Sequence, residues 1–318
     1  MCMQTGIIYT PGFLRHISYP EQLNRVKLTI NYFQTQNLTN FITPDHVGSD
    51  FIKSVHETSH IRAIGKNEKL LFDSTLAVEG CITAAKLLTE DKLNNAFVLC
   101  RPPGHHAHPN QFGGFCYFNN AAITTKYLQS TGFEKILIVD WDAHHGDGTN
   151  HIFRSDSSVL YCSIHESPLY PGSGAPDDHG AGEGLGYSIN LPVPHHTGHA
   201  TYSTLFDEII IPAAQKFNPD AIIISAGQDS HQDDPLTTLN LCQQSYFDLT
   251  TKLMNVNPKI IAVLEGGYNL TNLPKANHAI VCGLMKDTTH KFDLNILPET
   301  QKMKDSTTTS LDEFHKYW

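Results

Sequence analysis

Residues 139–148 carry three aspartates and two histidines directly after an apolar run, a composition that could bind a metal. The run at 136–139 predicts a buried strand. Because alternate residues of an extended segment point to one side, Asp140, Asp142 and His144 can project together from the strand's carboxyl end. Ligands bind at that end of the strands in open α/β sheets, and carboxylate with imidazole suits a borderline metal such as zinc. A polar strand-to-helix loop is the alternative, but so many ionisable groups in one short stretch disfavour it.

Three further apolar runs that predict strands also end in polar clusters. These clusters are His105-His106 after residues 96–100, Asp229 after residues 221–226, and residues 265–268 after residues 260–264. The carboxyl ends of parallel strands meet at one edge of a sheet, so the four clusters can form one pocket.

We expect a metal to bind Asp142, His144 and Asp229 in this pocket. Three protein ligands and one open position are the arrangement of a catalytic zinc site. Zinc lowers the pKa of bound water to about 7 and polarises a carbonyl group. Taken alone, Asp229 would be as well explained by helix capping; the neighbouring clusters favour ligation.

His105 and His106 follow a rigid Pro-Pro-Gly turn and are candidates for a general base and an electrostatic helper. Each imidazole needs a carboxylate on its other nitrogen, and Asp140 and Asp147 remain after metal ligation. Tyr268 lies in a Gly-Gly-Tyr turn whose glycines let the backbone approach the pocket closely. Its phenol could donate to a developing oxyanion, although a lone loop tyrosine more often packs on a rim.

The alternation of predicted strands and helices favours one α/β domain with a mostly parallel open sheet and helices on both faces. The polar residues 286–318 are expected to form a peripheral extension or a partly disordered tail. Strands are predicted at 6–10, 96–100, 135–139, 159–164, 187–193, 221–226 and 260–264. Helices are predicted at 21–33, 76–88, 121–128, 200–217, 241–254 and 274–285, with a short helix within 50–64.

The composition argues against several classes of partner. The formal net charge of −10, from 32 acidic and 22 basic residues, disfavours nucleic-acid binding. Seven cysteines with no CxxC pair predict free thiols, buried at Cys100 and Cys162, and a reducing compartment. No secretory pattern occurs at the N-terminus, and no apolar run approaches the roughly 18 residues of a membrane span. We therefore expect a cytoplasmic protein without membrane contact; export without a cleaved signal stays open.

Four motifs resemble those of the zinc-dependent histone deacetylase family, which includes bacterial acetylpolyamine amidohydrolases and acetoin-utilisation proteins. They are Arg101-Pro-Pro-Gly-His-His-Ala, Val139-Asp-Trp-Asp-Ala-His-His-Gly-Asp-Gly, Gly227-x-Asp-x-His-x-x-Asp-Pro-Leu and Glu265-Gly-Gly-Tyr-Asn. The resemblance covers residues 5 to 285 approximately, and the last two motifs look more like the class II branch. It implies an arginase-like α/β fold, with residues 1–285 as the catalytic domain.

The resemblance also implies roles for individual residues in deacylating an N-acetylated amine, typically acetyl-lysine. It assigns zinc to the three ligands named above, and ferrous iron suits the same ligand types. His106, paired with Asp147, would be the general base and acid, and His105, paired with Asp140, the electrostatic partner. Tyr268 would polarise the substrate carbonyl. Residues matching the acyl-lysine channel are Phe115, Tyr170 and Gly114.

Structural potassium is a further implication of the resemblance. One site would use Asp140, Asp142, His144, Ser163 and Ile164. A second would use Phe153, Asp156, Val159 and Tyr187. Arg25 matches an arginine near an internal cavity behind the metal.

The sequence departs from the family pattern in three places: the N-terminal loop, a neighbour of the metal ligand Asp229, and the cavity mouth. The stretch Tyr19-Pro-Glu-Gln-Leu-Asn-Arg25 stands where the family has His-Pro-Glu-Arg-Pro-Glu-Arg, and Gln228 stands where class II members usually have Phe. Leu236 occupies the place of an acidic gatekeeper in polyamine-specific relatives. An apolar residue there offers no counter-charge to a polyamine ammonium, which favours acyl-lysine.

We therefore expect a zinc-dependent amidohydrolase that removes acetyl or similar short acyl groups from lysine side chains of proteins or peptides. The alternatives are an acetylpolyamine amidohydrolase, a catalytically silent acyl-lysine binding module and, more weakly, an arginase-type dinuclear hydrolase. The single carboxylate at Asp229 favours one metal over two. The physiological substrate, the acyl length and the oligomeric state stay open.

Overall fold

The computed structural model describes residues 4–15, 20–46, 48, 50–294 and 296–318. Tyr19, in the first departure from the family pattern, lies outside these residues. The strands of the described chain form one sheet of eight parallel members in the order β2-β1-β3-β8-β7-β4-β5-β6. They are β1 (Thr5–Ile8), β2 (Phe41–Ile42), β3 (Asn95–Val98), β4 (Ile136–Asp140), β5 (Val159–Glu166), β6 (Ser188–Val193), β7 (Ala221–Ala226) and β8 (Ile260–Leu264).

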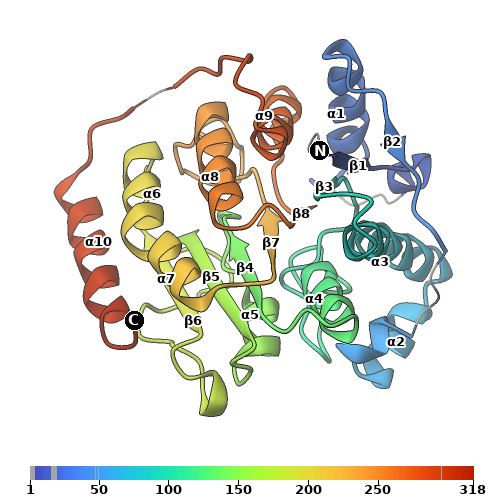
Figure 1. Ribbon diagram of the computed structural model, residues 1–318, viewed down its shortest axis with the longest axis horizontal. Helices are drawn as coiled ribbons and strands as arrows, with labels where there is room; N and C mark the ends of the chain where they lie inside the picture. The colour runs from blue at the N-terminus through green and yellow to red at the C-terminus, as the bar shows by residue number, and fades with distance from the viewer. Residues whose placement is uncertain (1–3, 16–19, 47, 49, 295) are drawn as a thin grey trace.

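Helices cover both faces of the sheet, as the sequence predicts (Figure 1). One face packs against α1 (Asn24–Thr35), α6 (His199–Leu205), α7 (Ile211–Phe217), α8 (Gln243–Val256) and α9 (Leu273–Met285). The other packs mainly against α3 (Glu68–Thr89) and α4 (Asn120–Ser130). Shorter helices are α2 (Thr58–Gly65), α5 (Asp147–Phe153), η1 (Pro11–Leu14), η2 (Ile52–Ser54) and η3 (Gly182–Gly184).

Strand β4 shows why the central strands read as continuous apolar runs. Leu137 and Val139 enter one hydrophobic cluster, and Ile136 and Ile138 enter the cluster on the opposite face. Successive side chains of a strand alternate between faces, so a strand covered on both sides must be apolar at every position. Such a strand is positioned rigidly, and so are the side chains that follow it.

The helix predicted over 200–217 is interrupted by a π-helical turn, η4 (Phe206–Ile210), between α6 and α7. Pro212 follows this turn and has no N–H to donate to the carbonyl four residues earlier. The regular hydrogen-bond ladder therefore cannot continue through this position, and the backbone shifts its register there.

Of the two alternatives for the polar C-terminal segment, residues 301–314 agree with a peripheral extension rather than a partly disordered tail. Residues Gln301–Phe314 form α10, whose N-cap Thr300 accepts a hydrogen bond from the Met303 amide. Met303 and Phe314 are buried. The helix packs on β6, the edge strand, and thereby covers the unpaired backbone that an edge exposes. The domain boundary after residue 285 stays a prediction.

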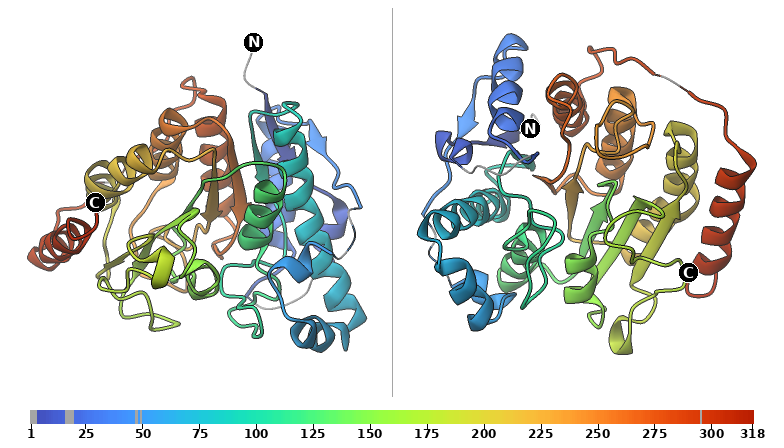
Figure 2. Two further views of the ribbon diagram at one scale, coloured as in Figure 1. Left: turned by 60° about the horizontal axis from the view of Figure 1, so that its bottom comes forward. Right: turned by 180° about the vertical axis from the view of Figure 1, so that it is seen from behind.

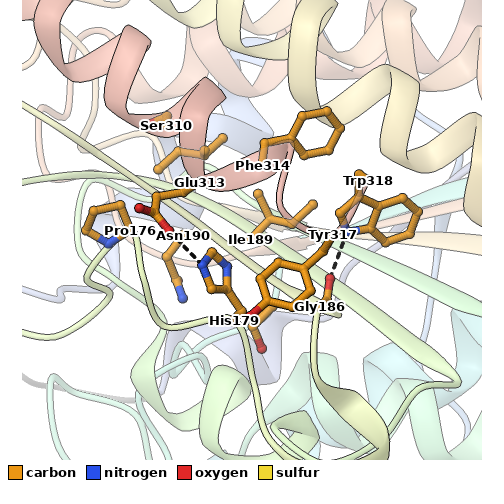
Figure 3. A pocket seen from close by; sticks show the side chains of 12 residues that line it. Pro176, His179, Gly186, Ile189, Asn190, Ser310, Glu313, Phe314, Tyr317 and Trp318 are labelled. Carbon is orange, nitrogen blue, oxygen red and sulfur yellow. Dashed lines mark hydrogen bonds and ion pairs between the residues drawn. The ribbon is translucent and has the colours of Figure 1, made fainter.

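A small cavity under the end of α10 shows how the chain terminus is held (Figure 3). Nε2 of His179 lies 3.0 Å from Oε2 of Glu313, and the Trp318 indole N–H donates to the Gly186 carbonyl at 2.8 Å. Seen from behind in Figure 2, α10 lies at the side of the molecule far from α1 and α2. Among the described residues, no helix is both long and apolar enough to cross a membrane.

Candidate active site

The four polar clusters predicted from the sequence follow β3, β8, β7 and β4, which are consecutive neighbours in the sheet. Because all four strands are parallel, their carboxyl ends meet at one edge and the clusters converge. They surround a cavity of about 60 Å³. Its lining comprises Pro103, His105, His106, Gly114, Phe115, Asp142, His144, Tyr170, Leu236, Gly266 and Tyr268.

The predicted metal ligands lie together at the base of this cavity. Nδ1 of His144 lies 3.1 Å from Oδ1 of Asp142 and 3.0 Å from Oδ2 of Asp229. The second oxygen of each carboxylate is held by the backbone. Asp142 Oδ2 accepts from the Gly266 N–H at 2.8 Å, and Asp229 Oδ1 accepts from the Ala143 N–H at 2.9 Å. These hydrogen bonds fix the orientation of the two carboxylates, as hydrogen bonds to metal-binding side chains do in other proteins.

Electrostatics at this point favour a bound cation. Both carboxylates are buried, and burial together with the charge of Asp142 raises the pKa of Asp229. Burial opposes a charged His144, yet its hydrogen bonds to the two carboxylates raise the pKa of the imidazole to about 10. Two buried carboxylates therefore favour a positive charge beside them. A donor set of two carboxylate oxygens and one imidazole nitrogen suits zinc or ferrous iron.

Two glycines leave the space in which these ligands lie. A Cβ at Gly227 would fall 2.1 Å from Oδ2 of Asp142, and one at Gly266 would fall 2.3 Å from Oδ2 of Asp229. Any larger residue would displace a ligand oxygen. The residues present therefore fit the metal that the sequence suggests.

Both predicted histidine–carboxylate pairs are present. Nδ1 of His105 lies 3.1 Å from Oδ2 of Asp140, and Nδ1 of His106 lies 2.7 Å from Oδ1 of Asp147. Burial works against a charged His105, but Asp142 and Asp140 raise the pKa of its ring well above the ordinary value. Burial and the neighbouring His105 lower the pKa of His106 to about 3. The two adjacent imidazoles thus have pKa values shifted in opposite directions, and the carboxylates outweigh burial at His105 only.

The sequence did not indicate that Asp147 serves two histidines. Its Oδ2 lies 2.8 Å from Nε2 of His108, so the carboxylate bridges His106 and His108. Nε2 of His56 accepts from the Asn119 N–H at 2.9 Å, which leaves its Nδ1–H to donate to the His108 carbonyl at 3.0 Å. The only sequence signal for His108 was its place two residues beyond His106.

Glu265 is a second residue whose role the sequence did not indicate. Its Oε2 accepts from the backbone N–H groups of Gly104 and His105, at 2.7 and 3.2 Å. Burial raises the pKa of this carboxyl to about 7. Glu265 therefore fixes the turn that presents the two histidines, and its position at a strand end was the available signal.

Two residues, Arg25 and Asp234, hold the segment around Tyr268 in place. Arg25 donates to the carbonyls of Glu265 and Gly267, and its guanidinium lies 5.0 Å from the centre of the Tyr268 ring. The Tyr268 N–H donates to Asp234 at 2.6 Å. Burial raises the pKa of the phenol well above its usual value, so the hydroxyl stays protonated and able to donate. Arg25 thus supports the tyrosine loop.

The predicted channel residues lie at the cavity mouth. Tyr170 is 52% exposed and Leu236 is 41% exposed, and both line the cavity. Gly114 and Phe115 are the central residues of a two-residue turn, with φ of 54° and 66°. Two positive φ angles are typical of a type I′ turn, but they strain a bulky residue. Strain of this kind occurs where a side chain must be presented to a site, here the Phe115 ring at the cavity.

Replacing Gly114 with Ala should displace His106 and lower kcat by on the order of a hundredfold, since misplacing a catalytic group by about 1 Å has that effect. The added Cβ would lie 2.2 Å from Cδ2 of His106, at a φ that disfavours alanine. Gly113→Ala is the matched control, because its Cβ would meet only the Tyr170 hydroxyl at 2.9 Å. Steady-state kinetics on both variants tests this, and an unchanged kcat for Gly114→Ala would contradict it.

The residues proposed for potassium fall into two places. Asp140 and Ser163 are register partners on β4 and β5, and Ile164 follows directly; Asp142 and His144 come after β4. Phe153, Asp156 and Val159 lie along the α5–β5 connection, joined by backbone bonds, and Tyr187 precedes β6. Both potassium sites stay predictions.

Comparison with known proteins finds relatives whose names all describe deacetylases. The family described as "Histone deacetylase domain" matches residues 19–284. A "Probable deacetylase" of Archaeoglobus fulgidus is 37% identical over 327 residues, covering 94% of this chain and 90% of the relative. "Histone deacetylase 15" of Arabidopsis thaliana is 38% identical over 250 residues, which are 72% of this chain but 45% of that protein. The solved structure titled "Crystal Structure of HDA15 HD domain" matches with a TM-score of 0.93 and 29% identity, covering 100% of this chain and 96% of that one.

Proposed function

The chain belongs to the histone deacetylase family, and from that premise we propose that it is a zinc-dependent hydrolase removing acetyl or similar short acyl groups from lysine side chains of proteins or peptides. One observation carries the proposal. The cavity of about 60 Å³ has aromatic and aliphatic side chains at its mouth, and it is also lined by His106, Tyr268 and two of the three converging ligands, Asp142 and His144. A linear acyl-lysine stem matches such a cavity in shape and polarity.

Asp147 binds Nδ1 of His106, which leaves Nε2 of that ring to take a proton from the attacking water and return it to the leaving amine. Tyr268 donates its phenolic hydrogen to the oxygen of the acyl carbonyl as negative charge develops there. The cationic His105, held by Asp140, stabilises the same charge through space. Asp142, His144 and Asp229 would hold the metal, which when bound supplies Lewis acidity toward the carbonyl and the water.

The cavity mouth favours lysine over polyamine substrates. Among the described lining residues the only carboxylate is Asp142, which lies at the base with the metal ligands. Leu236 presents an apolar surface at the mouth instead. A second ammonium group of a polyamine would therefore be desolvated there without a counter-charge, which disfavours its binding.

Metal removal provides the direct test. We expect chelator-treated protein to lose turnover of fluorogenic acetyl-, butyryl- and trifluoroacetyl-lysine peptides, and stoichiometric Zn²⁺ or Fe²⁺ to restore it. Returning each metal separately to the same apoprotein also shows which one supports the higher kcat. Acetylspermidine serves as the competing substrate in the same assay.

Other results of this assay would support one of the alternatives or contradict the proposal. Faster hydrolysis of acetylspermidine than of every peptide would replace lysine with polyamine as the substrate class. Peptide binding by the metal-loaded protein without hydrolysis would identify a binding module. Activity that survives complete metal removal would contradict the proposed chemistry itself.

A further inference from the structure

A second group of metal-ligating side chains lies away from the cavity, at the end of α9. His278 and Cys282 are four residues apart on this helix and therefore share one face. His290 comes from the segment that follows, and the three side chains offer ligand atoms within 4.8 Å of one another. None of them lines the catalytic cavity.

The backbone after α9 turns back so that this segment faces the helix. Lys286 adopts the left-handed conformation, with φ of 53°, and ends the helix. The next amide, of Asp287, donates to the Cys282 carbonyl at 2.9 Å. This reversal brings the Asp287 carboxylate and the His290 ring beside His278, whose ring centre lies 4.7 Å from that of His290.

Ordinary hydrogen bonding does not account for the cluster. His278 and Cys282 are each 2% exposed, and Nδ1 of His278 is buried with no hydrogen-bond partner. The other nitrogen, Nε2, lies 3.5 Å from the Cys282 sulfur, and a thiol is a weak donor. The weak contact between Nε2 and the thiol therefore does not by itself account for an imidazole buried beside Cys282.

We propose that His278, Cys282 and His290 form a second metal site, for a zinc-type divalent cation. Ligand atoms around tetrahedral zinc lie about 3.5 Å apart, given bonds of about 2.0–2.3 Å, and the Cys282–His278 separation matches this. Asp287 lies beside the three ligands without belonging to their group: its Oδ1 accepts from the Thr289 N–H and hydroxyl, while its Oδ2 lies 3.6 Å from Nε2 of His290.

Filling the site changes the protonation of its ligands. Zinc binds a neutral imidazole nitrogen and the thiolate form of cysteine. Metal binding must therefore displace the thiol proton, which passes to solvent as the metal–sulfur bond forms. His290 is 35% exposed and provides the side from which the ion enters.

Co²⁺ binding to the metal-free full-length protein tests the site independently of catalysis. A cobalt–thiolate bond gives a near-ultraviolet charge-transfer band, and the proposed catalytic ligands include no thiolate. We expect this band in the wild type, together with one metal equivalent beyond that held by the catalytic ligands. Cys282→Ser and His290→Gln should each abolish the band and lose that equivalent. Since His290 is partly exposed, its variant should fold even where Cys282→Ser does not.

Two further variants separate this site from the catalytic one. Asp229→Asn should lose the catalytic equivalent and keep the band. Cys116→Ser should also keep it; this control is needed because Cys116 lies near His105 and Glu265. A wild type that shows no band at saturating Co²⁺, or a band that persists in Cys282→Ser, would overturn the proposal. Failure of the deacetylase assay would leave all of these readouts unchanged.

Discussion

Replacing Tyr268 with Phe is expected to lower kcat by on the order of a hundredfold, the effect of removing one donor to an oxyanion. KM should change little, because the phenol interacts more strongly with the developing charge than with the neutral carbonyl of the substrate. Steady-state kinetics on an acetyl-lysine peptide with fully metallated protein measures both constants. We expect kcat to fall because the phenol, which lines the cavity, stays protonated and able to donate.

The substitution should leave the fold intact. The Tyr268 ring packs over the Arg25 guanidinium, and the Tyr268 N–H binds Asp234; neither contact uses the hydroxyl. Tyr170→Phe is the matched control, because Tyr170 lines the same cavity but is half exposed at the mouth. We expect that control to keep kcat. A near wild-type kcat for Tyr268→Phe, with an unchanged Tm, would remove the proposed role.

Replacing His106 with Ala is expected to reduce kcat by about 10²–10⁴, the range for loss of a general acid–base group. His106 is buried against Asp147 and lines the cavity. Without it, the water would lose its proton acceptor and the amine its proton donor. Single-turnover rates on the metallated variant measure the loss, and added imidazole should restore part of the rate.

His108→Ala is the informative control for this substitution. His108 binds the other oxygen of Asp147 but does not line the cavity. We expect its loss to disturb only the orientation of His106, with a smaller decrease in kcat and no rescue by imidazole. If both variants lost activity equally and neither were rescued, the assignment of proton transfer to His106 would fail.

Much of the candidate site could be predicted because its residues are adjacent in sequence. Asp142 and His144 are two residues apart after an apolar strand, so the period of a strand alone places them on one side. His105 and His106 follow a turn whose prolines and glycine exclude any regular element. The number of acids left after metal ligation matched the number of imidazoles, whereas the pairing of each histidine with Asp140 or Asp147 was implied only by the family resemblance.

Other features depend on contacts between residues far apart in the chain. His108 and Asp147 meet because α5 begins beside the histidine turn, and no local pattern predicts that contact. The helix α10 is polar and contains three consecutive threonines, which favour helix only weakly. It forms because Met303 and Phe314 find an edge strand to cover. In the same way His290 reaches His278 only through the left-handed turn at Lys286.

The sequence by itself determined the chemistry of this protein: which side chains are available, and which of them follow buried strands. Only the tertiary structure decided that β3, β8, β7 and β4 are neighbours, and hence that Asp229 and Tyr268 lie beside Asp142 and His144, more than eighty residues earlier in the chain. The physical reason is the range of the interactions. Side-chain periodicity is local and can be read from one segment, whereas strand order minimises exposed apolar surface over the whole chain at once.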